Sequence, residues 1–209
     1  DTHCHIDMQE RGRDGSEPQP PDELIALAAS VGVTKLVQIG CDVASARWSV
    51  EMARTRPDVI VGVALHPNEA PRLFESGGQQ ELDAAYEAIA ELAADPVVRA
   101  VGETGLDYFR TEGALREVQQ DSFRWHIELA KSVGKTLVIH DRDAHEDVIT
   151  VLTGQGAPNT VVFHCFSGDS AMARVCAEQG WYMSFAGVVT FKNNDSLREA
   201  LAVVPDDLV

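Results

Sequence analysis

The sequence predicts an α/β fold: a TIM-type (β/α)8 barrel that is truncated before its eighth strand. Short apolar segments rich in β-branched residues alternate with longer amphipathic segments along the 209 residues. The short segments are apolar at successive positions, as in strands that are buried on both faces, and parallel sheets consist of such strands. Regular strand–helix alternation indicates parallel strands that are joined by right-handed crossovers.

Seven short segments are predicted to be strands. The first is THCHID at residues 2–7, and the others are residues 35–40, 59–65, 97–103, 136–140, 160–166 and 181–187. An open doubly wound sheet is the alternative fold, but it usually carries a glycine-rich turn after its first strand. No such turn follows the first segment here, which favours the barrel.

Seven longer segments are predicted to be helices, one after each strand. They are residues 22–32, 45–57, 79–96, 115–134, 143–156, 169–180 and 194–205. Capping acids, terminal glycines and prolines mark several of their ends, whereas residues 11–23 have the proline and glycine content of a loop. We expect residues 1–209 to form a single barrel domain that lacks the C-terminal strand and helix, because the sequence ends where another strand would begin.

Composition narrows the classes of partner. The net charge is −16, from 33 acidic and 17 basic residues, and this argues against broad non-specific binding to duplex nucleic acid. The acidic net charge does not exclude a small phosphate-binding site. The four cysteines are scattered without a CxxC pair, as in reduced thiols of the cytoplasm, and no apolar run is long enough for a membrane span. We expect a cytoplasmic monomer without membrane contact.

Polar residues gather at the predicted strand ends, where barrels carry their chemistry. His3 and His5 lie in the first strand, and the later strands end near His66, Glu103, Asp107, His140, Asp141, Arg142 and His164. Residues i and i+2 of a strand point to the same face, roughly 6.5–7 Å apart. The pair His3 and His5 is therefore predicted to reach one metal ion, with Cys4 turned toward the core.

The predicted ligand set is too large for one tetrahedral ion with an open position. It comprises His3, His5, Glu103, His140 and His164. Two divalent ions bridged by a carboxylate fit it better, and Glu103 is the central candidate. Imidazole and carboxylate ligands allow Mg, Mn or Zn without choosing among them. Two such ions can activate water and stabilise charge during displacement at phosphorus or at a carbonyl.

Six motifs occur in the order of a known family. They are DTHCHID, GVALHP, VGETGLDYFR, VIHDRDA, FHCFSG and SFAGVVTFKN, and they span essentially the whole sequence. With them the chain resembles the TatD family of metal-dependent deoxyribonucleases, within the amidohydrolase-like metal-dependent hydrolases. The resemblance implies a barrel and a divalent-metal phosphodiesterase, a 3′–5′ exonuclease that prefers single-stranded DNA.

The resemblance also implies roles for single residues. His3 and His5 match the ligands of one ion, Glu103 matches the bridging glutamate, and His140 and His164 match the ligands of the second ion. His66 matches a histidine that contacts substrate phosphate, and Arg142 stands where a cation could hold a phosphate oxygen. The family continues into an eighth strand with a Glu-Thr-Asp motif, whose aspartate binds metal; this sequence ends at Val209 before it.

Two other functions remain open from the sequence. One is an amide or ester hydrolase on the same barrel, such as an aminoacyl-tRNA deacylase. The other is a non-catalytic metal-binding protein, which the absence of the eighth strand would favour.

Several polar and aromatic residues are predicted to lie outside the chemistry. His126 is expected to be structural, His145 to lie at the surface, and Asp107 to orient a ligand or hold a loop, whereas Lys192 is left open between a phosphate contact and a solvated loop. Core packing is expected for Cys165, Trp48, Trp125 and Trp181.

Overall fold

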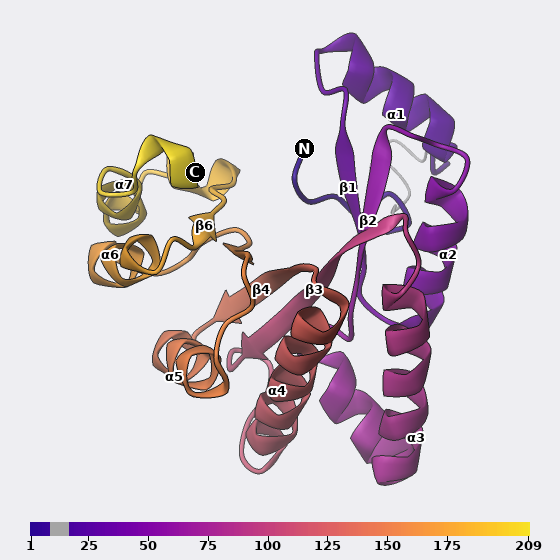
Figure 1. Ribbon diagram of the computed structural model, residues 1–209. Coiled ribbons are helices and arrows are strands. Elements are labelled where there is room, and N and C mark those ends of the chain that lie inside the picture. Colours follow the sequence, from indigo (N-terminus) through magenta and orange to yellow (C-terminus); the bar gives the residue numbers. More distant parts are fainter. Residues whose placement is uncertain (9–16) are drawn as a thin grey trace.

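A parallel sheet of six strands forms the centre of the computed structural model, which describes residues 1–8 and 17–209 (Figure 1). The strands are β1 (Leu36–Gly40), β2 (Val59–Val63), β3 (Val98–Asp107), β4 (Thr136–Arg142), β5 (Val161–Phe163) and β6 (Tyr182–Met183). Each strand pairs in parallel with the next one along the chain. A doubly wound sheet reverses its strand order at a switch point, so the sequential order agrees with the predicted barrel type.

The structure corrects the prediction of a first strand over residues 2–7. In the structure this segment makes an isolated parallel bridge between Cys4 and Gln38, and the chain turns at Ile6 and Asp7. Two backbone hydrogen bonds support the bridge. Cys4 N donates to Val37 O at 2.9 Å, and Ile39 N donates to Cys4 O at 3.0 Å. The pairing is too short for a strand, but it places the segment along the edge of β1.

The helices follow one another around the outer side of the sheet (Figure 1). They are α1 (Pro21–Ser30), α2 (Val43–Ala53), α3 (Glu69–Ala93), α4 (Leu115–Val133), α5 (His145–Gln155), α6 (Ser170–Glu178) and α7 (Asp195–Leu201), with 3₁₀ turns at Gly187–Thr190 and Asp206–Leu208. Capping residues in the sequence account for some of the helix ends. Asp42 and Ser45 form a capping box at the start of α2, and Gly134 ends α4 in the left-handed conformation.

Helix α3 begins earlier than its predicted start at residue 79. Residues before that point are helical from Glu69, and the two helical parts meet at Gly78, whose φ of 67° and ψ of −160° interrupt the helix. Glycine adopts this backbone conformation without a steric cost. The loop predicted over 11–23 falls partly outside the described residues, and its described end already contains the start of α1 at Pro21.

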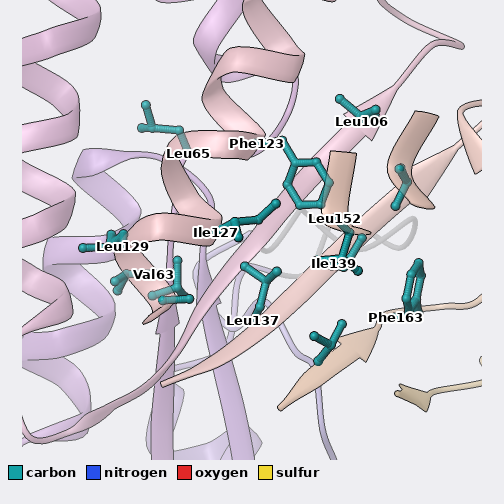
Figure 2. Close-up of a cluster of buried hydrophobic side chains, with 14 of the residues drawn as sticks. Val63, Leu65, Leu106, Phe123, Ile127, Leu129, Leu137, Ile139, Leu152 and Phe163 are labelled. Carbon is teal, nitrogen blue, oxygen red and sulfur yellow. The ribbon is translucent and has the colours of Figure 1, made fainter. Parts of the chain in front are cut away.

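The two faces of the sheet differ because side chains alternate along each strand. Leu137 and Ile139 of β4 pack outward into the core between the sheet and the helices. Val138 lines a cavity on the opposite face together with Val162 of β5, and His140 continues that inner row. Figure 2 shows part of the outer core, formed by Val63, Leu65, Leu106, Phe123, Ile127, Leu129, Leu137, Ile139, Leu152 and Phe163.

An irregularity in β3 turns Glu103 inward. The register between β3 and β4 shifts between Val101 and Thr104. Val101 belongs to the outer core, yet Glu103, two residues later, lines the inner cavity and is 4% exposed. Regular alternation would put both side chains on the same face, so the shift is what brings this carboxylate inside.

Two predicted core residues are corrected. Cys165 is only half-buried and lines the inner cavity, because the chain turns directly after β5, where Cys165 has a φ of 45°. Trp48 on α2 is 37% exposed. Trp181 is buried as predicted, and Trp125 is partly buried against the core.

The four cysteines are free thiols. Within residues 1–8 and 17–209, the helices are all too short or too polar to cross a bilayer.

His126 of α4 has the predicted structural role. It is fully buried; the amide of Leu65 donates to its Nε2 at 3.0 Å, and its Nδ1 donates to the carbonyl of Ser122 at 2.7 Å. Both ring nitrogens are satisfied only in this neutral tautomer. Burial accordingly lowers the pKa of His126 to about 4. The imidazole fixes α4 to the segment that follows β2 and leads to His66.

We expect acid to destabilise the fold through His126. Its pKa is below the ordinary value of 6.5, so the unfolded chain takes up a proton first as the pH falls. The stabilisation is therefore complete above about pH 6.5 and is lost as the pH falls toward about 4, by roughly 3 kcal/mol. Urea unfolding across this pH range should show a smaller loss of stability in His126→Leu than in the wild type. Equal losses would contradict the prediction.

Candidate metal centre

The carboxylate of Glu103 lies among histidines that come from distant parts of the chain. Its Oε2 lies 3.1 Å from His3 Nε2 and 3.9 Å from His5 Nε2. Its Oε1 lies 2.5 Å from His140 Nδ1 and 3.9 Å from His66 Nε2. The two oxygens thus face two different pairs of histidines.

His164 joins the cluster on the side of His3. The two imidazole rings stack with centroids 3.3 Å apart and an interplanar angle of 14°. Ligand atoms of His3, His164 and Glu103 lie within 4.8 Å of one another, and the same holds for His66, His140 and Glu103. The structure therefore places His164 beside His3, while His140 lies beside His66. The five predicted ligands nevertheless lie in one cluster.

The side chains of His3 and His5 come together at their ring nitrogens. Their Nε2 atoms are 3.1 Å apart, close enough to be ligands of one ion. His5 Nδ1 lies 3.2 Å from the carbonyl of Ile39. If Nδ1 carries the proton that this carbonyl accepts, the Nε2 lone pair is free for a metal.

The electrostatics of the cluster keep Glu103 ionised. Burial alone raises the pKa of a carboxyl group, but hydrogen bonds from His140 and His3 outweigh burial, so the pKa of Glu103 lies far below its usual range. The same pairing raises the pKa of His140 against the effect of its own burial. Burial lowers the pKa values of His66 and His164 to about 4, which leaves both rings neutral near pH 7.

The donor atoms fit divalent metal ions. His3 Nδ1, His164 Nδ1 and His140 Nε2 are buried and have no hydrogen-bond partner among residues 1–8 and 17–209. Buried polar atoms are rarely left without a partner, and these atoms belong to imidazole rings that gather around an ionised carboxylate. Imidazole nitrogen with carboxylate oxygen is a donor set for Zn or Mn, and the carboxylate also suits Mg. The cluster is therefore compatible with divalent metal binding.

Asp107 lies behind His140 and is held by a buried polar network. Its Oδ2 lies 3.4 Å from His140 Nε2 and accepts a hydrogen bond from Asn68 Nδ2 at 3.1 Å. Its backbone amide donates to Gln119 Oε1 at 3.0 Å, and Gln119 also donates to Thr111 Oγ1 at 2.7 Å. Asp107 and Gln119 are buried. The network fixes the carboxylate that faces the His140 ring.

We expect Asp107→Asn to weaken metal binding without unfolding the protein. The amide keeps the volume of the side chain but removes the charge facing His140, and such changes behind a ligand typically cost roughly 10- to 100-fold in affinity. Calorimetric titration with Zn²⁺ or Mn²⁺ measures the loss. Asp83→Asn, on the exposed side of α3, is the matched control. Equal affinities of Asp107→Asn and the wild type would contradict the positioning role.

Arg142 stands at the mouth of the cluster. It is exposed at the end of β4 and lines two cavities, of about 600 and 450 Å³, that also contain Glu103, His5 and His140. Its guanidinium lies 3.8 Å above the ring of Phe109. Arg142 therefore places a positive charge at the rim of the cavities that Glu103 and the histidines line.

Some residues that sequence reasoning missed lie at this site. Asn68 and Gln119 position Asp107, and their roles come from contacts across 39 and 12 residues that no local pattern shows. Cys41 has its thiol 4.0 Å from His5 Nδ1, in a group with Glu103. Cys41 directly follows β1. The expectation that functional residues lie at strand ends, which located the other site residues, therefore also applies to Cys41.

Other residues lie away from the cluster. His145 Nδ1 lies 2.6 Å from Asp141 Oδ2 at the start of α5, and its side chain is 38% exposed. This pairing raises the pKa of His145. Lys192 is exposed, and its backbone carbonyl accepts a hydrogen bond from Arg198 at 3.3 Å.

Comparison with known sequences identifies relatives across the whole chain. The family model described as TatD related DNase matches residues 1–209. The chain is 43% identical over 209 residues to an uncharacterized metal-dependent hydrolase, TatD, of Mycobacterium tuberculosis, covering 98% of this chain and 75% of that protein. It is 34% identical to the uncharacterized metal-dependent hydrolase YabD of Bacillus subtilis, covering 99% of this chain and 76% of that protein.

Solved structures agree in fold. The crystal structure of YjjV, a TatD homologue from Escherichia coli, superposes with a TM-score of 0.79 at 26% identity, covering 98% of this chain and 74% of that one. A hydrolase of the TatD family from Entamoeba histolytica gives 0.75 at 18% identity, covering 98% and 69%. The chain belongs to the TatD family of metal-dependent hydrolases.

Proposed function

We propose that residues 1–209 form one hydrolase domain that uses two divalent metal ions to cleave phosphodiester bonds, as a 3′–5′ exodeoxyribonuclease on single-stranded DNA. One observation carries the proposal. The Oε2 atom of Glu103 faces His3 and His5, whereas its Oε1 atom faces His140 and His66. A carboxylate with a different set of imidazoles at each oxygen is suited to bridge two ions.

The cluster supplies ligands for both ions. His3 and His5 face one oxygen of Glu103, His140 faces the other, and His164 stacks on His3 at the edge of the same cluster. Bound divalent ions would neutralise charge on a phosphodiester and make a water molecule more acidic. The protein positions the donors, and it excludes bulk water by burying Glu103.

His66 is the group of the cluster best suited to hold a substrate oxygen. The amide of Asn68 donates to its Nδ1 at 3.2 Å, so the proton of the neutral ring sits on Nε2, which points toward Glu103. Because burial keeps the ring neutral near pH 7, Nε2–H donates a hydrogen bond without adding a buried charge. It can hold a non-bridging oxygen of the phosphodiester as negative charge develops.

Arg142 contributes the fixed positive charge. Its guanidinium is always protonated and can donate two parallel hydrogen bonds to phosphate. Arg110 also lines the smaller cavity beside it. A few cations at the mouth are enough for the phosphate groups near a strand end, and this reconciles a nuclease with a net charge of −16.

A direct assay tests the proposal. A single-stranded oligonucleotide labelled at its 5′ end is incubated with the protein and Mg²⁺, Mn²⁺ or Zn²⁺, alongside an aminoacyl-tRNA and a p-nitrophenyl phosphodiester. The proposal predicts a ladder that shortens from the 3′ end, cleavage of the phosphodiester and no release of the amino acid. Chelation should stop both reactions. Release of the amino acid without DNA cleavage would instead support a deacylase, and no metal-dependent hydrolysis would contradict the proposal.

A further inference from the structure

Phe109 is an aromatic side chain at the edge of the candidate metal centre that neither the core nor the cluster uses. It is 59% exposed, although the guanidinium of Arg142 covers one face of its ring at 3.8 Å. Exposing so much of a phenyl ring is unfavourable in water. Its position in the loop directly after β3 puts it at the carboxyl ends of the strands, where the cluster lies.

The loop that carries Phe109 is fixed on both sides. The amide of Tyr108 donates to the carbonyl of Arg142 at 2.9 Å, and the amide of Arg110 donates to Asp107 Oδ1 at 3.1 Å. Asp107 is itself buried and held by Asn68. The ring is therefore presented on a backbone that is already ordered, so a ligand that stacks on it has little ordering entropy to overcome.

Arg142 joins Phe109 to the reacting centre. The same guanidinium that packs on the ring lines both cavities that contain Glu103 and His140. A ligand that places an anionic group between Arg142 and the cluster therefore has its neighbouring group close to the ring. In a nucleotide, the group next to the phosphate is a sugar with a flat, aromatic base.

We propose that Phe109 and Arg142 form a subsite that stacks the base of the 3′-terminal nucleotide, with Phe109 as the stacking platform. This inference rests on the proposed nuclease function and adds how that site recognises its substrate. Stacking on an aromatic side chain is tolerant of base identity, since every base has a π face. It also favours single strands, whose bases can be splayed out, over a duplex, in which the bases stay stacked and paired.

The test compares two oligonucleotides in steady-state cleavage. One is a single strand with a normal 3′-terminal nucleotide, and the other is identical except that this nucleotide lacks its base. We expect Phe109→Ala to raise KM roughly tenfold for the normal strand, with kcat nearly unchanged. For the abasic strand, Phe109→Ala and the wild type should have equal kinetics. Phe109→Tyr should retain the wild-type KM, and Phe109→Leu should behave as Phe109→Ala, because it is apolar without a π face.

Controls and outcomes separate this inference from the proposed function. Phe74→Ala removes an aromatic ring that is 38% exposed on α3, and it should leave both substrates unaffected. If Phe109→Ala cleaves the normal strand like the wild type, or impairs both strands equally, the stacking subsite is wrong while the nuclease stands. If the wild type cleaves neither strand, the proposed function fails and the subsite fails with it.

Discussion

Glu103→Gln is expected to abolish metal-dependent hydrolysis while the protein stays folded. Glutamine has nearly the volume of glutamate, so the packing around this buried position persists. The amide has no negative charge, and one end of it is a donor that cannot bind a cation. In the wild-type protein, each oxygen of Glu103 faces a separate pair of histidines. One substitution therefore removes a ligand from both proposed ions.

The expected loss in kcat/KM is roughly a thousandfold or more, because charge stabilisation at the reacting phosphate depends on both ions. Hydrolysis of a p-nitrophenyl phosphodiester and calorimetric metal titration measure the two effects. Glu87→Gln, at an exposed position on α3, provides the matched control and should resemble the wild type. Substantial activity in a folded Glu103→Gln protein would show that the carboxylate is not the centre of the chemistry.

Gly105→Ala is expected to cause the largest loss of stability. Gly105 pairs with His140 in the sheet, and an added Cβ would lie 2.0 Å from the carbonyl oxygen of His140. Its φ of 139° is also unfavourable for residues that carry a side chain. The backbone of β4 would have to move, and with it the imidazole of His140. We expect a loss of roughly 3–5 kcal/mol in the free energy of unfolding.

Urea unfolding followed by circular dichroism measures this loss, and metal titration reports the displacement of His140 in any protein that still folds. Gly154→Ala is the natural comparison, since it lies in α5 and its added Cβ meets no atom within 4 Å. That control should be neutral or slightly stabilising, by up to about 1 kcal/mol. A Gly105→Ala protein as stable as the Gly154→Ala protein would contradict the close approach of β3 and β4.

The parts of the fold that the sequence predicts are those with a local periodic signal. Parallel strands in chain order follow from apolar runs that alternate with amphipathic segments. The shared face of His3 and His5 follows from the two-residue period of extended backbone. The same period fails at Glu103, where the register shift between Val101 and Thr104 has no sequence marker other than a nearby glycine.

Features that depend on contacts between distant segments could not be predicted. Residues 2–7 were expected to be a strand, but the pairing with β1 extends over a single bridge before the chain turns at Ile6. The stacking of His164 on His3 joins residues that are far apart in the sequence. The exposure of Phe109 is likewise invisible in the sequence, because an apolar residue after a strand usually packs into the core.

The most direct test of the central claim is the electron paramagnetic resonance spectrum of the wild-type protein titrated with Mn²⁺. Two ions that share the carboxylate of Glu103 should bind per chain and give the spectrum of an exchange-coupled pair. Glu103→Gln should lose this coupling. A wild-type protein that binds one Mn²⁺ per chain, or two with the six-line spectra of isolated ions, would contradict the bridged pair on which the proposed function depends.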